Sequence, residues 1–392
     1  MKLAIVANVL TPYRVYFHRR LQQEVTGLDL HTLLTSGPSP LPWQMDVSDL
    51  KVVRFPVAET ARTGRIARFW RDWRIGRAIL DYFYENEIDA AAVNGYSDLA
   101  RLRVIAGCWR ISRPVLLRAD SNIRGDRQIS SARRLAKKAV ISWATARCEA
   151  LLVMGELGRE FFEVYGTEGV PMFTVPYDLD VAAFHRAEPQ DVLDFCSQHG
   201  LDPTRSRMIY VGRLVPVKAV EDLLAAFVNV APDRQNWDLV IAGSGPLEGE
   251  LKATVPQDLR HRVSWLGFVD HDSLPSAYHA CHLFVLPSLK EPWGVVVTEA
   301  LAAGLPVVAS DAVGAAHELL RDGKGGAIFA ASNVGDLVEK LRYATSPGGW
   351  QKLAAEVPGS FNRWRSQADP VMGLLKALES VTGYVGPSKL GP

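Results

Sequence analysis

The sequence predicts an α/β protein built from two Rossmann-like, doubly wound domains that face an interdomain cleft. Short apolar runs alternate with longer amphipathic segments, and this rhythm stops near residue 185 and starts again after it. The chain has 392 residues, which suits two domains at roughly 150 residues each. We expect an N-terminal domain over 1–185, a C-terminal domain over 186–365, and a final helix and tail over 366–392 that could pack back on the first domain.

Strands of a buried parallel sheet are expected in the first domain wherever a short apolar run is followed by a helical segment. These strands are 3–7, 28–34, 90–93, 115–117 and 151–153, and the helices between them are 13–24, 66–86, 99–109 and 132–146.

The second domain repeats the same alternation. Its expected strands are 208–211, 239–242, 263–265, 283–286, 307–309 and 327–329, with a helix over 219–230 and a last helix over about 371–380. Ligands of such folds bind at the carboxyl ends of the strands, so the motifs at those ends decide the function.

Composition excludes several classes of protein. Apolar residues make up 48% of the chain and charged residues 22%, which is globular rather than disordered, and the formal net charge is only +1. The four cysteines are far apart and form no Cys-x-x-Cys pair, which favours a reducing, cytoplasmic location over a disulfide framework or a zinc site. The apolar start is too short for a signal peptide, and no stretch approaches the roughly 20 apolar residues of a membrane span.

The strongest motif starts at the end of the strand 283–286 and continues into a helix. Gly294 stands at the helix entrance, where a missing side chain lets a phosphate reach backbone N–H groups. Glu291 is expected in the loop before it and Glu299 in the second turn of the helix, and carboxylates suit sugar hydroxyls. The alternative is a helix-capping Glu291 and a solvated Glu299.

Two further motifs follow strand ends of the same domain. Gly212, Arg213 and Lys218 follow the strand 208–211, and a planar guanidinium beside a mobile ammonium suits a diphosphate. The alternative is a solvated loop with two surface cations. Gly243 and Gly245 form a glycine turn after the strand 239–242, which is a weak signal by itself.

Together these segments resemble the retaining glycosyltransferases of family GT4, which have the two-domain GT-B fold. The resemblance rests on the Glu-x7-Glu motif from Glu291 to Glu299, on Gly-Arg-Leu at 212–214 followed by Lys218, and on Gly-x-Gly-Pro at 243–246. It covers nearly the whole second half.

The resemblance implies a role for each motif residue. Arg213 and Lys218 would hold the diphosphate of a nucleotide-sugar donor and, with Glu291 on the transferred sugar, form the catalytic group. The donor would also contact the following residues: Gly212, Gly243, Gly245, Gly267, Phe268 near the base, Gly294, Val295 at the phosphates, and Glu299 at the ribose.

The first domain departs from the family pattern. The glycine pair common after the first strand is replaced by the segment 8–14, and a His common in this domain has no evident counterpart. Candidates for acceptor contacts are Tyr13, Arg14, Arg118, Asp120 and Ser121, although Asp120 and Ser121 could simply form a local turn.

Residues 61–138 form a basic segment with 17 Lys+Arg against 8 Asp+Glu. Aromatic residues are interleaved with arginines over 62–77, and 124–138 is also basic. These two segments could make peripheral contact with an anionic membrane, or they could solvate helices whose Trp residues belong to the core. Nucleic acid is not expected as a partner, because no recognised module accompanies the charge.

We therefore expect a glycosyltransferase of hexosyltransferase type that retains anomeric configuration, moves a sugar from a nucleotide-diphosphate donor to a glycan, lipid-linked or small-molecule hydroxyl, and serves polysaccharide biosynthesis. The alternatives are a nucleotide-sugar epimerase and a non-catalytic nucleotide-sugar-binding protein. No cofactor and no essential metal are expected. Asp178-Leu179-Asp180 has the Asp-x-Asp form of a metal site, but its surroundings resemble the interdomain loop of the GT4 family.

Overall fold

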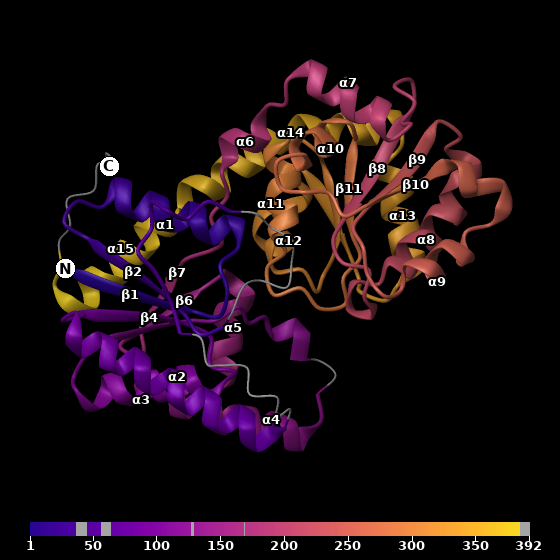
Figure 1. Cartoon of the computed structure of the whole chain (residues 1–392). Coiled ribbons are helices and arrows are strands. Elements are labelled where there is room, and N and C mark those ends of the chain that lie inside the picture. The colour runs from indigo at the N-terminus through magenta and orange to yellow at the C-terminus, as the bar shows by residue number, and fades with distance from the viewer. Residues whose placement is uncertain (37–44, 56–63, 127–128, 168, 385–392) are drawn as a thin grey trace. The chain divides into compact units, whose positions relative to one another are not determined.

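The computed structural model describes residues 1–36, 45–55, 64–126, 129–167 and 169–384. It divides into two compact units (Figure 1). Unit 1 comprises Met1–Ile123, Gln128–Asp178 and Ala368–Pro392, and unit 2 comprises Arg124–Arg127 and Leu179–Gln367.

The division differs from the expected boundary at residue 185. The chain joins unit 2 directly after Asp178, because the buried side chain of Phe184 packs with unit 2 residues such as Tyr278, whose ring centroid is 6.0 Å away. The last segment belongs to unit 1 from Ala368 onward.

Unit 1 contains a parallel sheet with the order β3-β2-β1-β4-β5-β6-β7 in its described residues. The strands are β1 (Lys2–Ala7), β2 (Asp29–Leu34), β3 (Val52–Arg54), β4 (Ala90–Asn94), β5 (Val115–Arg118), β6 (Ala150–Val153) and β7 (Met172–Thr174). The helices are α1 (Pro12–Glu24), α2 (Arg65–Glu85), α3 (Leu99–Arg110), α4 (Ser131–Thr145), α5 (Glu156–Val164) and α15 (Pro370–Thr382).

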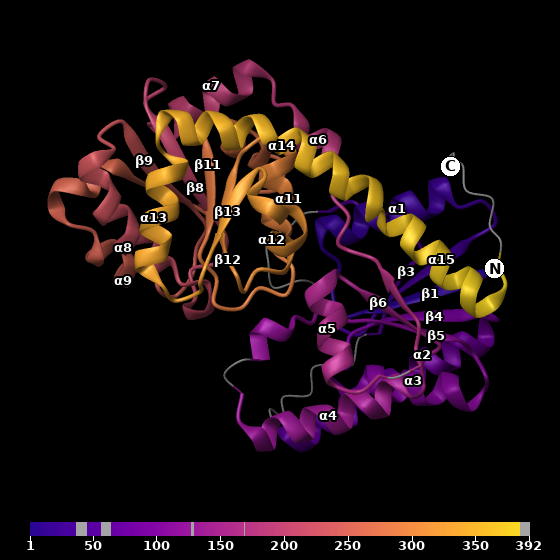
Figure 2. The same cartoon turned by 180° about the vertical axis from the view of Figure 1, so that it is seen from behind.

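Alternation along the strands of unit 1 places a large apolar core on each face of the sheet in the described residues, and a smaller cluster lies around Ala7, Leu34 and Leu50. Ala4 and Val6 of β1 belong to the core that includes side chains of α2, α3, α4 and α5. Leu3 and Ile5 belong to the opposite core, with side chains of α1 and α15. The views from both sides show α15, from the end of the chain, beside α1 from its start (Figure 2).

Arg20 of α1 holds together the two points where the chain leaves and re-enters unit 1. Its guanidinium binds the carboxylates of Asp178 and Asp369, each at 2.9 Å, and also that of Glu24 at 2.7 Å. The Asp178 side chain is fully buried. A charge buried this deeply requires such partners, so this network fixes the start of α15 against α1.

Unit 2 contains a second parallel sheet, with the order β10-β9-β8-β11-β12-β13 in its described residues. The strands are β8 (Ser206–Val211), β9 (Trp237–Ala242), β10 (Val263–Gly267), β11 (Leu283–Leu286), β12 (Val307–Ser310) and β13 (Gly326–Phe329). The helices are α6 (Val181–His185), α7 (Pro189–Gln198), α8 (Val220–Val230), α9 (Glu248–Thr254), α10 (Leu274–His279), α11 (Val295–Ala302), α12 (Gly314–Leu319), α13 (Val334–Ala344) and α14 (Pro347–Gln367).

The expected fold class is confirmed, since each unit has a parallel sheet whose strand order reverses beside its first strand. All eleven strands expected from the sequence are present, with ends shifted by at most two residues. Two strands were missed, β3 and β7, because each has only three residues and neither forms a long apolar run.

No helix in the described part of the chain has the length and apolar character needed to cross a bilayer. Cys108, Cys148, Cys196 and Cys281 are all buried and free.

Candidate active site

The loops after β8, β9 and β11 gather the motif residues of unit 2. Strands β8 and β11 are neighbours at the point where the strand order of the sheet reverses, and both loops leave from the carboxyl edge of the sheet. The backbone N–H of Leu289 donates to the carbonyl of Val217 at 2.9 Å, which joins the loop after β11 to the loop after β8. Sequence motifs about 70 residues apart therefore form one site.

The glycines of the third motif allow two loops to approach each other closely. A Cβ atom on Gly243, whose φ is +152°, would lie 1.8 Å from the carbonyl oxygen of Gly212. A Cβ atom on Gly245 would lie 2.3 Å from the carbonyl oxygen of Leu214. The Gly-x-Gly turn therefore packs directly against the loop that carries Arg213. This close backbone contact explains both glycines, because a side chain at either position would clash.

Lys218 and Glu291 form an ion pair between these loops. The ammonium group of Lys218 donates to Oε2 of Glu291, and Ser288 Oγ lies 3.5 Å from the same oxygen. Both side chains are largely buried, at 18% and 14% exposed. Lys218 ends the 3₁₀ turn Pro216–Lys218, and the turn is closed by Ala219 in the left-handed region with φ of 48°. A buried non-glycine residue in that region marks a constrained loop.

Glu291 is held by its backbone as well as by its side chain. Its N–H donates to the carbonyl of Ala312 at 3.3 Å, and its carbonyl accepts from the N–H of Gly314 at 3.2 Å. Glu291 is therefore a loop residue facing Lys218 and not a cap of α11, which begins after Gly294. The capping alternative for Glu291 is wrong.

Gly294 opens helix α11 as the sequence indicated. Its φ of +92° lies in the region that favours glycine, and a Cβ atom there would meet Val313 at 3.0 Å and Glu291 at 3.1 Å. No side chain caps this end of the helix. The first-turn N–H groups, beginning at Val295, give this end of α11 a positive potential beside Glu291.

Glu299 is buried inside unit 2. Its Oε2 accepts a hydrogen bond from the hydroxyl of Tyr278 at 2.8 Å. Burial raises the pKa of Glu299 above its ordinary value, although the hydrogen bond from Tyr278 opposes the shift. The alternative of a solvated Glu299 is therefore wrong, because the second turn of α11 is buried. Tyr278 was not anticipated, since nothing in α10 marks it as a partner of an acid.

Arg213, Gly267 and Phe268 lie on the open side of these loops. The carbonyl of Arg213 accepts from the hydroxyl of Tyr210 at 2.9 Å, while its side chain is exposed. Among the described residues, no carboxylate lies within ion-pair distance of Arg213. Gly267, with φ of +69°, accepts from the N–H of Gly243 at 2.6 Å, and the ring of Phe268 is half-exposed. An unpaired cation and an exposed ring can both bind an incoming ligand.

Burial raises the pKa of the Tyr210 hydroxyl, and the charge of Glu291 adds to the effect. Tyr210 is thus a neutral neighbour of the Lys218–Glu291 pair, a position that nothing in the sequence indicates.

The acceptor candidates of unit 1 gather at the carboxyl edge of its sheet. The hydroxyl of Tyr177 donates to Asp120, whose carboxylate lies 3.9 Å from the guanidinium of Arg14. The ring of Tyr13 lies 4.3 Å from that of Tyr177, measured between centroids. Asp120 thus takes part in more than the local turn that the alternative proposed.

Arg118 and Ser121 differ from the other candidates. Arg118 is buried and donates to the backbone carbonyls of Val175 and Pro176, at 3.2 and 2.8 Å. It supports the chain leaving β7 and does not offer an open guanidinium. The hydroxyl of Ser121 lies 3.2 Å from that of Tyr96, so Ser121 is part of a polar pair at the same edge.

His18 interacts electrostatically with two of these candidates, Arg14 and Arg118, and its side chain is buried. Burial, together with the charges of Arg14 and Arg118, lowers its pKa to about 3. It is therefore neutral, and its Nδ1 lies 2.8 Å from Oγ1 of Thr32. This histidine supports the core and does not replace the open histidine common in the family.

The two acids of the Asp-x-Asp segment, Asp178 and Asp180, bind groups of the protein itself. Asp178 binds Arg20, and Asp180 caps α6 by accepting from the N–H of Ala183 at 3.3 Å. Both acids therefore have structural roles.

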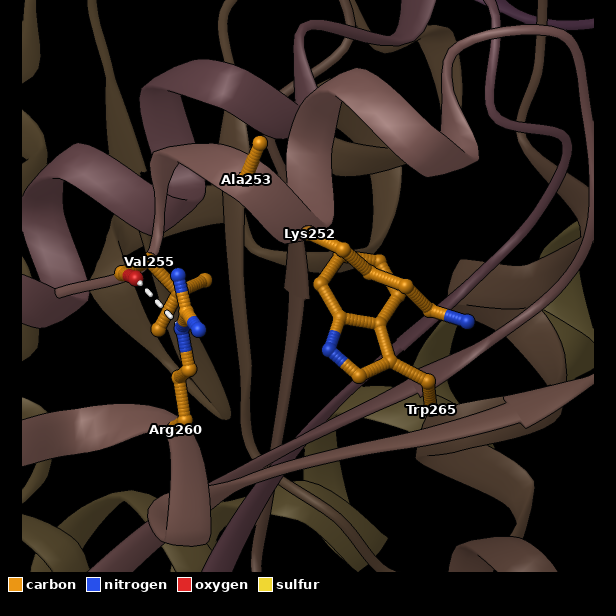
Figure 3. A pocket seen from close by; sticks show the side chains of 5 residues that line it. All are labelled: Lys252, Ala253, Val255, Arg260 and Trp265. Carbon is orange, nitrogen blue, oxygen red and sulfur yellow. Dashed lines mark hydrogen bonds between the residues drawn. The ribbon is translucent and has the colours of Figure 1, made fainter. Parts of the chain in front are cut away.

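A separate pocket of unit 2 lies between α9, the segment before β10, and β10 itself (Figure 3). It has a volume of about 400 Å³ and is lined by Lys252, Ala253, Val255, Arg260 and Trp265. Lys252 pairs with Glu248 at 2.7 Å, and Arg260 donates to the carbonyl of Val255 at 3.3 Å. None of the motif residues lines it, so it is distinct from the candidate active site.

Comparison with known proteins finds similar glycosyltransferases. Residues 194–353 match the family described as glycosyl transferases group 1. The mannosyltransferase LpsB of lipopolysaccharide core biosynthesis from Rhizobium meliloti is 33% identical over 43% of this chain and 49% of its own length. The D-inositol 3-phosphate glycosyltransferase of Rhodococcus jostii is 30% identical over 55% of this chain and 51% of its own length. The chain thus spans about half the length of the curated relatives it matches.

Solved structures match nearly the whole chain. HepE from Anabaena, in complex with UDP and glucose, superimposes with a TM-score of 0.74 at 18% identity, covering 98% of this chain and 100% of its own. WaaG, a glycosyltransferase involved in lipopolysaccharide biosynthesis, gives 0.70 at 16% identity, covering 97% and 100%. The fold is therefore GT-B, and residues 194–353 match the model of the glycosyl transferases group 1 family. The resemblance inferred from the motifs is confirmed.

Proposed function

We propose that this protein is a retaining glycosyltransferase that moves a sugar from a nucleotide-diphosphate sugar to a hydroxyl of a glycan, lipid-linked or small-molecule acceptor. The observation that carries the proposal is the Lys218–Glu291 pair, placed beside the amino end of α11 by the loops after β8 and β11. The family match of residues 194–353 and the UDP-containing complexes of a structural neighbour support it.

The cations of unit 2 would bind the diphosphate of the donor. Arg213 is exposed and has no carboxylate partner in the described residues, and Lys218 lies across the loop contact from Glu291. The free N–H groups of the first turn of α11, beginning at Val295, would also donate hydrogen bonds to the diphosphate. As the sugar leaves, negative charge grows on the diphosphate, and preoriented positive groups stabilise that transition state.

The acids and the exposed ring would bind the rest of the donor. Glu291 would accept hydrogen bonds from hydroxyls of the transferred sugar, and Glu299 from those of the ribose. Phe268 would pack against the base, next to Gly267. Gly212, Gly243 and Gly245 would keep the loop that carries Arg213 close to the phosphates.

Retention would follow from reaction on one face of the sugar. The bond between the anomeric carbon and the diphosphate oxygen breaks, and the acceptor oxygen forms its bond on the same face. The acceptor proton passes to the departing diphosphate, so all charge is accounted for without a covalent enzyme intermediate. The acceptor would be held in unit 1 by Tyr13, Arg14, Asp120 and Ser121. Arg118 would act indirectly, by holding the backbone before Tyr177 through its hydrogen bonds to Val175 and Pro176.

We also infer that no metal ion is needed, because Arg213, Lys218 and α11 supply the positive charge that a metal would otherwise bring. Chelation by EDTA should leave the rate unchanged. A rate abolished by EDTA and restored by Mn²⁺ would contradict this part of the proposal.

The four buried, free thiols support a reducing, cytoplasmic location, and we propose polysaccharide biosynthesis as the setting. We also propose that the segments 62–77 and 124–138 make peripheral contact with a membrane. The exposed basic residues of α2 and α4 within these segments support this. Arg62, Arg127 and Gln128 of these segments lie outside the described residues.

The decisive experiment offers the purified protein a panel of UDP-, GDP- and dTDP-sugars together with glycan and lipid-linked acceptors. We expect mass spectrometry to detect an acceptor enlarged by one sugar, and NMR to show the anomeric configuration of the donor in the product. Turnover of the donor to an isomer without acceptor would indicate an epimerase. Binding of a donor without any turnover across the panel would indicate a binding protein.

A further inference from the structure

The first two turns of helix α2 have no buried side chain in the described structure, and the ring of Phe69 contacts only rings of the same helix, those of Trp70 and Trp73. From Arg65 to Arg71 no side chain is buried, and the first buried residue of the helix is Asp72. Ile66 is 76% exposed and Trp70 is 53% exposed. Helices in proteins owe most of their stability to packing of an apolar face, so two unpacked turns with large apolar side chains indicate a partner.

Helix α4 has the same property. No side chain from Ser131 to Val140 is buried, and Leu135 is 71% exposed. Trp143, about two turns after Leu135, is also exposed. Two helices of one unit therefore present unpacked apolar side chains at their amino-terminal halves.

An apolar groove lies where these helices meet α3. All three helices contribute to the core on the same face of the unit 1 sheet (Figures 1 and 2). The groove has a volume of about 950 Å³. Its apolar lining includes Trp73, Leu80, Tyr84, Leu102, Val140 and Trp143. Its volume and its mostly apolar lining suit a hydrocarbon chain, and no side chain of the candidate active site lines it.

The surroundings of the groove are strongly basic. The exposed cations are Arg65, Arg68, Arg71, Arg74 and Arg77 on α2, and Arg133, Arg134 and Lys138 on α4, with Lys137 partly buried beside the ring of Phe161. The acids of α2 are Asp72, Asp81 and its last residue Glu85, and α4 has none. Asp72 lies 2.8 Å from Arg71 and Asp81 lies 3.6 Å from Arg77. A second copy of the chain would bring the same cations face to face, which disfavours self-association through this surface.

We propose that this surface docks on an anionic phospholipid bilayer, with an acyl chain entering the α2–α3–α4 groove and the cations binding lipid head groups. Apolar side chains that insert, interleaved with cations that stay at the head groups, are the composition of an interfacial helix. Tryptophan suits this depth because its ring is apolar and its N–H is polar. The inference deepens the proposed peripheral contact and does not depend on sugar transfer.

The first test measures co-flotation of the full chain with vesicles of phosphatidylcholine alone or mixed with phosphatidylglycerol. We expect binding to the anionic vesicles only, lost with added salt. Neutralising Arg133, Arg134, Lys137 and Lys138 to Gln should weaken binding at least about tenfold. Leu135→Glu should weaken binding to a similar extent, because it replaces an exposed apolar side chain of α4 with a negative charge. Leu193→Glu, at a 55% exposed leucine of α7 in unit 2, is the matched control and should bind as the wild type does.

The second test addresses the groove itself. Phosphatidylglycerol with brominated acyl chains should quench the fluorescence of Trp73 and Trp143. The double variant Trp73→Phe/Trp143→Phe should show clearly less quenching than the wild type while still floating with vesicles, because only exposed tryptophans outside the groove, such as Trp70, then remain to be quenched. Equal quenching in wild type and double variant would show that no chain enters the groove.

Other results would overturn the proposal as a whole. Absence of binding to anionic vesicles would do so, as would a dimer in light scattering that Leu135→Glu converts to a monomer without any effect of lipid. Far-UV circular dichroism and thermal unfolding, compared with the wild type, check that each variant is folded. If the wild-type protein binds anionic vesicles but transfers no sugar, the proposed function is contradicted and the membrane proposal is not.

Discussion

At the scale of single residues, the site depends on a positive charge placed beside an acid. Lys218 is held by a constrained turn and Glu291 by two backbone hydrogen bonds, so both side chains are oriented before any ligand arrives. Preorientation of this kind is what lets electrostatic groups act on a transition state without reorganisation.

Removing the positive charge of Arg213 or of Lys218 should therefore slow the proposed sugar transfer. We expect Arg213→Ala and Lys218→Ala each to lower kcat by roughly a hundredfold or more, equivalent to about 3 kcal/mol. Lys252→Ala, at a cation of the separate pocket in the same unit, should keep the wild-type rate. Steady-state kinetics with the preferred donor measures this, and wild-type rates in both active-site variants would refute the assignment.

His18 provides a residue-scale prediction for pH. Its pKa in the folded protein is about 3, whereas an unfolded chain would have its ordinary value of 6.5. Between these values the unfolded state binds a proton that the folded state does not, so stability is fully present above pH 6.5 and falls as the pH is lowered. Each pH unit in that window should cost roughly 1 kcal/mol of unfolding free energy.

We expect His18→Gln to reduce this slope, measured by urea unfolding at several pH values. Since other groups also titrate, the comparison is the difference between variant and wild type. Parallel stability curves for the two proteins would mean that His18 takes up a proton in the folded state as readily as in the unfolded state.

At the scale of elements, the loops after β8 and β9 fit together only because Gly243 and Gly245 lack side chains. The carbonyls of Gly212 and Leu214 occupy the space that a Cβ atom would need. The backbone N–H of Leu214 also donates to the carbonyl of Ser244 at 3.0 Å, which holds the two loops together.

Gly243→Ala should therefore displace the loop that carries Arg213. We expect a loss of roughly 1–3 kcal/mol in unfolding free energy, together with weaker donor binding. Gly249→Ala is the matched control, because this glycine lies in helix α9 with open space around its Cβ position. That change should be neutral or slightly stabilising. Calorimetry and donor titration measure the two effects, and equal behaviour of the variants would contradict the loop contact.

At the scale of the whole molecule, the end of the chain completes the unit formed by its beginning. Val371, Leu374 and Leu378 of α15 are buried in the core that contains Leu3 and Ile5 of β1. Arg20 binds both Asp178 and Asp369, so the last helix is fixed by charge at its first turn and by apolar packing along its length.

Ending the chain after Gln367 should expose that face of the unit 1 sheet. Burial of each apolar side chain contributes about 1.5–3 kcal/mol, so we expect unit 1 to lose more than about 5 kcal/mol and to unfold before unit 2. Leu374→Asp should have a similar effect in the full chain, whereas Lys376→Asp, at an exposed position of the same helix, should not. Thermal unfolding and limited proteolysis distinguish these outcomes, and resistance of the shortened unit 1 to protease would refute the prediction.

Much of this protein could be predicted from the order of its residues. The apolar runs predicted eleven of the strands, since a parallel strand buried on both faces is written as a continuous apolar segment. The motifs from Gly212 to Lys218 and from Glu291 to Glu299 predicted the family, because tight turns and charged ligands restrict which residues a position accepts.

What the sequence could not decide was which residues pair across distance. The three-residue strands β3 and β7, the hydrogen bond from Tyr278 to Glu299, the partners of Arg118, and the network of Arg20 with Asp178 and Asp369 appear only in the folded chain. Sequence periodicity reports the local environment of a residue, and burial of a polar group depends on partners that tertiary folding brings from elsewhere in the chain.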